Sequence, residues 1–148
     1  MSTINEVAVV ILNYKSWKDT LNEIDMCHKE IGIDYENIIV VDNASPNESK
    51  EELEKNSQLG YRFIYSAENN GYASGNNIGL KCAFNNGYKY ALILNNDILF
   101  KGNYSSLNNF FRNYYFYTCF FNISERIYKN TTPYIINFNF HFFSKFYL

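Results

Sequence analysis

The apolar run VAVVIL at residues 7–12 decides how this sequence folds. It is continuously apolar and rich in β-branched residues, as expected for a strand that is buried on both faces of a parallel sheet. Three further strands are predicted, at residues 38–41, 61–66 and 90–94. The strand at 61–66 is less apolar than the others, so we expect it nearer an edge of the sheet.

Segments with helical character separate these strands. The first begins at Ser16 and ends at Gly32, the second begins near Ser49, and the third covers about residues 72–86. Helical spacing in the first segment predicts one buried face, with His28 at its edge, made of Trp17, Leu21, Ile24, His28 and Ile31. Strand and helix therefore alternate, which predicts an α/β fold with a mostly parallel, Rossmann-like sheet and helices on both faces.

Composition divides the chain near residue 100. Residues 1–100 hold 11 aromatic residues and a formal charge of −6, whereas residues 101–148 hold 17 aromatic residues and a charge of +4. A total of 148 residues, 47% of them hydrophobic, is enough for one globular domain with a core. We predict a structured region over 1–100. We expect the tail over 101–148 to be irregular or poorly ordered and not a separate domain.

The tail has two explanations. Phe, Tyr, Asn, Ile and Lys make up 32 of its 48 residues, and all five have codons built only from A and T. An AT-rich stretch read in a shifted frame would have this composition. The rival hypothesis is a genuine aromatic segment that packs against a partner or a membrane surface. Its apolar runs fall well short of the roughly 18–20 residues that cross a bilayer, so no transmembrane segment is expected.

Several function classes are disfavoured. The amino terminus has no basic region before its apolar stretch, so no secretory signal is expected. Three cysteines without CxxC spacing fit a reducing compartment and argue against a zinc site. The basic residues are scattered among acidic ones, so no nucleic-acid partner is expected. These features favour a cytoplasmic protein.

Polar residues follow each predicted strand. Asn13, Asp42, Asn69 and Asp97 lie at or just beyond the four strand ends, and ligands of such sheets bind outside the carboxyl ends of the strands. Either aspartate could simply cap a turn. Mg²⁺ or Mn²⁺ is typically held by one or two carboxylates and substrate phosphates, so Asp97 could hold a metal on a diphosphate. Asp42 could accept hydrogen bonds from a base or a ribose.

Three glycines, Gly71, Gly75 and Gly79, are spaced four residues apart after the third strand. This spacing matches neither the dinucleotide fingerprint nor the phosphate-binding P-loop, which disfavours NAD(P) and ATP hydrolysis. Gly71 can adopt a positive φ in the turn. A structural role, close packing of helix on sheet, is favoured for Gly75 and Gly79.

Four motifs together resemble the family-2 glycosyltransferases with the GT-A fold, especially their rhamnosyltransferase-like group. The motifs agree with the family in order and spacing over residues 6–100, and they read VAVVILNYKSWKDTL, IIVVDNAS, ENNGYASGNNIGL and YALILNND. The resemblance implies transfer of a sugar from a nucleotide-diphosphate sugar to an acceptor glycan or lipid-linked glycan, with Mg²⁺ or Mn²⁺. It suggests cell-surface polysaccharide synthesis, peripheral at the inner membrane face.

The resemblance also implies roles for individual residues. Two residues are expected in the loop that lines the nucleotide pocket, namely Asn13 and Tyr14. Asp42 resembles the residue that contacts the base, with Asn43 and Ser45 beside it. The loop and helix start that close over the donor correspond to Asn69, Gly71, Tyr72, Gly75 and Asn76.

The family's D-x-D metal motif corresponds here to Asn95, Asn96 and Asp97. Because its first position is an asparagine, Asp97 is expected to carry most of the metal binding. The resemblance further requires an acceptor-binding region and a general base. The tail offers one acid, Glu125, in a context unlike the family's, and no catalytic residue is assigned.

We therefore predict the donor-binding half of a glycosyltransferase, truncated and with reduced or no activity. A non-catalytic nucleotide-binding remnant is the first alternative. A nucleotidyltransferase is the second and weaker one, because it should have a glycine-rich basic loop after the first strand, and NYKSWKD at residues 13–19 has no glycine.

Overall fold

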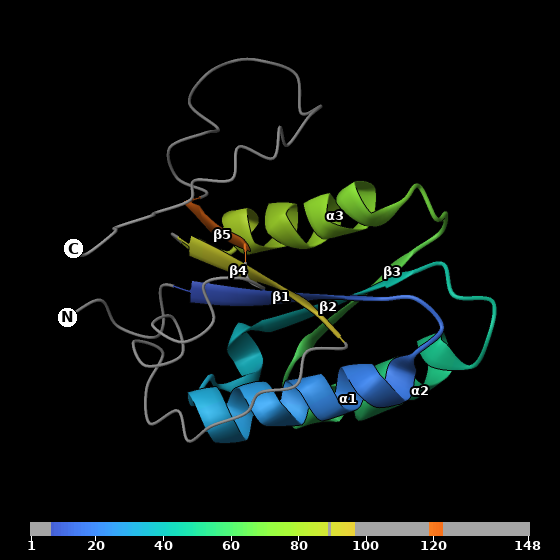
Figure 1. Cartoon of the computed structure of the whole chain (residues 1–148), viewed down its shortest axis with the longest axis horizontal. Helices are drawn as coiled ribbons and strands as arrows, with labels where there is room; N and C mark the ends of the chain where they lie inside the picture. Colours follow the sequence, from blue (N-terminus) through green and yellow to red (C-terminus); the bar gives the residue numbers. More distant parts are fainter. Residues whose placement is uncertain (1–6, 89, 97–118, 123–148) are drawn as a thin grey trace, which may run out of the picture.

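The computed structural model describes residues 7–88, 90–96 and 119–122 of the chain (Figure 1). Its sheet has the strand order β3-β2-β1-β4-β5. The first four strands run parallel, and β5 is antiparallel to β4. Their bounds are Val7–Asn13 (β1), Ile38–Asn43 (β2), Arg62–Ser66 (β3), Tyr90–Asn95 (β4) and Cys119–Asn122 (β5).

Helices cover both faces of the sheet (Figure 1). One face carries α1 (Trp17–Met26) and α2 (Ser49–Asn56), and α3 (Tyr72–Asn85) covers the other. A π-helical turn over Cys27–Ile31 prolongs α1 up to Gly32. Short 3₁₀ turns lie at Tyr35–Asn37 and Ser57–Leu59. The expected α/β architecture is confirmed.

The alternation of side chains along β1 explains why its sequence is apolar throughout. Val9 and Ile11 belong to the core beneath α1 and α2, whereas Ala8 and Val10 belong to the core beneath α3. All four are fully buried. Burying a valine or isoleucine side chain contributes about 1.5–3 kcal/mol, so both faces of this strand stabilise the fold.

Two glycines bring α3 close to the sheet. A Cβ atom added at Gly75 would lie 2.4 Å from Leu12 Cδ1, and one added at Gly79 would lie 2.3 Å from Val10 Cγ1. Both separations are far below van der Waals contact. The predicted packing role of these two residues is therefore borne out by the geometry.

The buried face of α1 is rotated from the predicted one. Ile24 and Ile31 are buried as expected, but Trp17 and Leu21 are only half-buried. The polar residues Thr20 and Glu23 and the thiol of Cys27 take the fully covered positions. His28 lies at the edge of the stripe as predicted, stacked on the ring of Tyr35.

The two sides of the sheet end differently. β3 is the outermost strand on one side, as its lower apolar content predicts. On the other side β5 pairs with β4, with Cys119 opposite Ile93 and Asn122 opposite Tyr90. These four tail residues form a regular strand where an irregular tail was expected. The division of the chain at residue 100 stays a prediction, and Glu125 lies outside the described residues.

Among the described residues, no helix has the length and apolar character needed to cross a membrane.

Candidate functional site

The four parallel strands bring their polar ends to one edge of the sheet, which we call the carboxyl edge. In the strand register, Asn13 lies opposite Asp42 and Leu12 lies opposite Asn95. The predicted convergence of Asn13 and Asp42 is therefore present. Asp97 lies outside the described residues.

A pocket of about 270 Å³ opens at the carboxyl edge between β1 and β4. The chain progresses from β1 to β3 in one direction across the sheet and places β4 on the other side of β1. This point between β1 and β4 is the topological switch point, where open α/β sheets bind ligands. We call it the switch-point pocket, and its lining is Leu12, Tyr14, Tyr72, Asn95 and Asn96.

Two exposed tyrosines line the switch-point pocket. Tyr14 is 43% exposed and Tyr72 is 48% exposed. The Tyr72 hydroxyl donates to Asn95 Oδ1 at 2.7 Å, which links the start of α3 to the end of β4. The ammonium of Lys15 lies 4.7 Å from the centre of the Tyr14 ring. The pocket thus combines aromatic surface, amide groups and a nearby cation.

At the same carboxyl edge, on the α1 side of the sheet, lies a buried set of hydrogen bonds, which we call the edge network, formed by Asn13, Thr20, Asp42 and Ser45. Asn13 Nδ2 donates to Asp42 Oδ1 at 2.5 Å and to Ser45 Oγ at 3.3 Å. Asp42 also accepts from the Ser45 hydroxyl at 2.6 Å and from the Ser45 backbone N–H at 3.0 Å. The side chains of Asn13 and Asp42 have no exposed surface, so the conformation described here covers both completely.

Thr20 connects α1 to this network, and the sequence analysis did not single it out. Its hydroxyl donates to Asn13 Oδ1 at 2.8 Å and accepts from Asn96 Nδ2 at 2.9 Å. Asn96 Nδ2 also donates to Ser16 Oγ at 3.1 Å. The available sequence signal was a hydroxyl residue one helical turn after the predicted helix start at Ser16.

The loops that follow β1 and β2 contain strained backbone. Lys15 has a φ of 67° and Ala44 a φ of 55°, and these are the positive-φ residues other than glycine within the described part of the chain. Ser45 holds the first loop, because its hydroxyl accepts the Lys15 backbone N–H at 2.8 Å. Such strain costs about 1–3 kcal/mol per residue and clusters at functional sites.

A third group of predicted residues fixes the loop between β3 and α3. Asn43 Nδ2 donates to Asn69 Oδ1 at 2.9 Å, and the same oxygen accepts the Gly71 N–H at 3.0 Å. Gly71 has a φ of 88°, as predicted for this turn. Asn76 is buried beneath the helix start and donates to the Tyr72 carbonyl at 3.0 Å.

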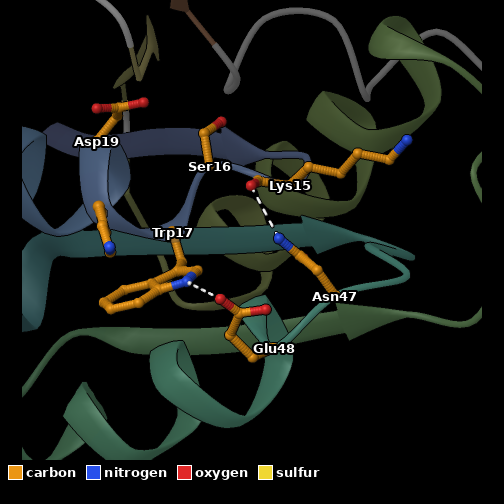
Figure 2. A pocket seen from close by; sticks show the side chains of 7 residues that line it. Lys15, Ser16, Trp17, Asp19, Asn47 and Glu48 are labelled. Atoms are coloured by element: carbon orange, nitrogen blue, oxygen red, sulfur yellow. Dashed lines mark hydrogen bonds between the residues drawn. The ribbon is translucent and has the colours of Figure 1, made fainter.

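A second pocket, of about 320 Å³, lies between the start of α1 and the loop before α2 (Figure 2). Figure 2 shows Trp17 Nε1 donating to Glu48 and Asn47 Nδ2 donating to the Lys15 carbonyl, at 3.2 and 2.9 Å. The pKa of Glu48 lies below its usual range, first because of a backbone hydrogen bond and then because of the Trp17 indole. None of the residues predicted for donor binding lines this pocket.

The described residues contain no cluster of three or more His, Cys, Asp or Glu side chains that could hold a metal. They do place one hard oxygen atom, Asn95 Oδ1, at the end of β4, two residues before Asp97. Amide and carboxylate oxygens suit Mg²⁺ or Mn²⁺. Asn95 Oδ1 is thus an oxygen of a suitable type, and the predicted main ligand, Asp97, is outside the described residues.

The parallel sheet, the helices on both faces and the polar switch-point pocket define a Rossmann-like α/β fold with a candidate ligand site at its carboxyl edge. The chain belongs to glycosyl transferase family 2, because the sequence model of that family matches residues 8–145. This confirms the resemblance to the family-2 glycosyltransferases. No curated protein matches the sequence.

Two solved structures have a similar fold. The mannosyltransferase PcManGT from Pyrobaculum calidifontis, in complex with GDP-Man and Mn²⁺, is 19% identical with a TM-score of 0.56 over 66% of this chain and 29% of that one. TarS from S. aureus is 21% identical with a TM-score of 0.52 over 62% of this chain and 16% of that one. The chain therefore spans less than a third of either protein.

Proposed function

We propose that this chain binds the nucleotide part of a nucleotide-diphosphate sugar in the switch-point pocket, as the donor-binding half of a family-2 glycosyltransferase. The observation that carries the proposal is the meeting of Tyr14, Tyr72, Asn95 and Asn96 in one pocket at the switch point of the sheet. An exposed tyrosine ring can stack on a base. The complex of the mannosyltransferase PcManGT with GDP-Man and Mn²⁺ supports a ligand of this class.

The metal proposed for this site is Mg²⁺ or Mn²⁺, with Asp97 as its main protein ligand and Asn95 beside it. When bound, such a cation would neutralise negative charge on the diphosphate as it leaves. Asp42 as a base contact stays a prediction. Its described contacts are structural, because it accepts hydrogen bonds from Asn13 and from Ser45 in the loop after β2.

In the proposed reaction the acceptor hydroxyl oxygen bonds to the anomeric carbon of the sugar. The bond from that carbon to the diphosphate oxygen breaks, and its electron pair leaves with the nucleoside diphosphate. The proton of the acceptor hydroxyl passes to a general base, a role to which we assign no residue. The acceptor class proposed is a glycan or a lipid-linked glycan in cell-surface polysaccharide synthesis, at the cytoplasmic face of the membrane.

The test is calorimetric titration of the full chain with GDP and with UDP, with and without Mn²⁺. We expect binding of at least one nucleotide that Mn²⁺ tightens, and loss of that tightening in Asp97→Ala. Asp34→Ala is the matched control, because Asp34 is exposed and precedes β2 at the opposite edge of the sheet.

Release of GDP from GDP-mannose, or of UDP from a UDP sugar, would show turnover. Metal-dependent binding without release would favour the non-catalytic alternative. A chain that binds neither nucleotide would overturn the proposal.

A further inference from the structure

We propose that Thr20 is a positioning residue that couples the end of β4 to Asp42 at the end of β2. The inference rests on the function proposed above and names a residue that acts through others. Thr20 is the fourth residue of α1, at the end of its first turn; it is fully buried, and its hydroxyl bonds to Asn96 after β4 and to Asn13 at the end of β1.

The hydrogen bonds between side chains around Thr20 run in one direction, and the Ser16 carbonyl, at 3.2 Å, is a second and more distant acceptor for the Thr20 hydroxyl. Asn96 Nδ2 donates to Thr20 Oγ1 at 2.9 Å, and Thr20 Oγ1 donates to Asn13 Oδ1 at 2.8 Å. Asn13 Nδ2 then donates to Asp42 Oδ1 at 2.5 Å. The chain of donors ends on a carboxylate, and each bond in such a chain polarises the next.

A hydroxyl is required at this position. Asn96 presents a donor and Asn13 presents an acceptor, so the group between them must accept from one and donate to the other. An apolar side chain of the same shape would leave the buried Asn13 Oδ1 without its donor, at about 1–3 kcal/mol, and would leave Asn96 Nδ2 with Ser16 Oγ as its acceptor. This link accounts for a buried hydroxyl on the covered face of α1.

The hydrogen bonds through Thr20 connect two parts of the proposed site, which would contact different parts of the donor. Asn96 immediately precedes Asp97, the proposed metal ligand, whereas Asp42 and Asn13 hold the loops on the nucleotide side. A change in the position of Asn96 when metal and diphosphate bind would reach Asp42 through Thr20. We infer that part of the effect of Mn²⁺ on nucleotide affinity passes through this hydroxyl.

The experiment compares nucleotide affinity with and without Mn²⁺ in the full chain and its variants. The readout is the ratio of the two Kd values, because a merely structural defect lowers both affinities alike and leaves the ratio unchanged. We expect Thr20→Val to reduce the ratio at least fivefold. Thr20→Ser keeps the hydroxyl and should stay within twofold of the unmodified chain.

Ser16→Ala is the matched control. It removes the other acceptor of Asn96 Nδ2 but touches neither Asn13 nor Asp42, so the ratio should not change. An unchanged ratio in Thr20→Val overturns the proposal, as does an equal loss in Ser16→Ala.

Asn96→Ala breaks the link from its other end and replaces Thr20→Val if that variant does not fold. An unchanged ratio in Asn96→Ala likewise overturns the coupling. If the unmodified chain binds no nucleotide, the proposed function and this inference fail together. If it binds and only the ratio test fails, the proposed function stands without the role of Thr20.

Discussion

Asn13 and Asn95 lie near the ends of adjacent parallel strands, yet Asn13 is fully buried and Asn95 is open to solvent. Asn13 uses its whole amide group inside the protein, where it bonds to Thr20, Asp42 and Ser45. The side chain of Asn95 instead accepts a hydrogen bond from the exposed Tyr72 hydroxyl. Asparagine thus has a structural role at the end of β1 and lines the pocket at the end of β4.

The residues at the carboxyl edge thus form two groups, a buried one that we call the covered layer and a solvent-accessible one that we call the open layer. The covered layer is the edge network of Asn13, Thr20, Asp42 and Ser45, and the open layer is Tyr14, Tyr72, Asn95 and Asn96. Changes in the covered layer should lower the free energy of unfolding. Changes in the open layer should weaken ligand binding and leave stability nearly unchanged.

The largest effect is expected for Asp42→Ala. Removal of the carboxylate leaves three buried donor groups, from Asn13 and Ser45, without their acceptor, and each costs about 1–3 kcal/mol. We expect the free energy of unfolding to fall by about 3 kcal/mol or more in chemical denaturation. The exposed Asp34→Ala should change it by less than about 0.5 kcal/mol. A loss below about 1 kcal/mol in Asp42→Ala would place that residue in the open layer instead.

Gly75→Ala should affect both layers. The new methyl group meets Leu12, which forms part of the pocket lining, and lies 3.3 Å from Asn43 Cγ. Overpacking of this kind costs about 1–3 kcal/mol, only partly offset by the better helix propensity of alanine. We expect lower stability together with a several-fold weaker nucleotide affinity.

Gly79→Ala is its matched control, because the same overlap occurs one turn further along α3, against Val10. This variant should lose stability and keep its nucleotide affinity. Equal losses of affinity in the two glycine variants would mean that α3 as a whole, and not Leu12, transmits the effect.

Tyr14→Ala tests the open layer. Loss of a stacking ring should weaken nucleotide binding by about 1 kcal/mol, or roughly fivefold, with the midpoint of denaturation unchanged. Tyr65→Ala is a close control, since Tyr65 is 41% exposed on β3 and also carries a lysine, Lys50, over its ring at 4.5 Å. Titration calorimetry should separate the two, and equal affinity losses would argue against stacking on Tyr14.

Tyr72→Phe should have the smallest effect. It removes the hydrogen bond to Asn95 Oδ1 and keeps the ring, so we expect a two- to threefold weaker affinity, in line with about 0.5 kcal/mol for an exposed bond. Tyr88→Phe removes a hydroxyl bonded to Asn37, next to β2 at the opposite edge of the sheet, and should leave affinity unchanged. A Tyr72→Phe chain with unaltered affinity would remove that hydroxyl from the site.

The positions of the four parallel strands could be predicted from the sequence, because each is a short apolar run. The lower apolar content of residues 61–66 also predicted that β3 is less buried than the others. The face of α1 could not, because its two most important covered residues, Thr20 and Glu23, are polar and fall outside any hydrophobic pattern. The positive φ of Lys15 and Ala44 could not be predicted from the sequence either. Both conformations depend on contacts with distant residues, such as the hydroxyl of Ser45 for Lys15.

The sequence predicts which polar residues gather at the carboxyl edge, but not which of them are buried. Strand order alone brings Asn13, Asp42 and Asn95 to one edge, and parallel pairing guarantees it. Which of them meets solvent depends on how the loops after β1 and β2 fold back over the strand ends. The conformation of these loops depends on individual hydrogen bonds between residues far apart in the sequence. One example is the bond from the Lys15 N–H to the Ser45 hydroxyl, whose partners are 30 residues apart, and no local sequence pattern predicts it.

The pairing of β5 with β4 stops short of the carboxyl edge. β5 lies opposite residues 90–93, whereas β1 pairs with β4 as far as Asn95. Among the described strands, Leu94 and Asn95 therefore have a paired neighbour on one side, as β3 does along its whole length. The end of β4 that lines the switch-point pocket is thus held to the sheet by β1, and the support of β5 ends two residues before it.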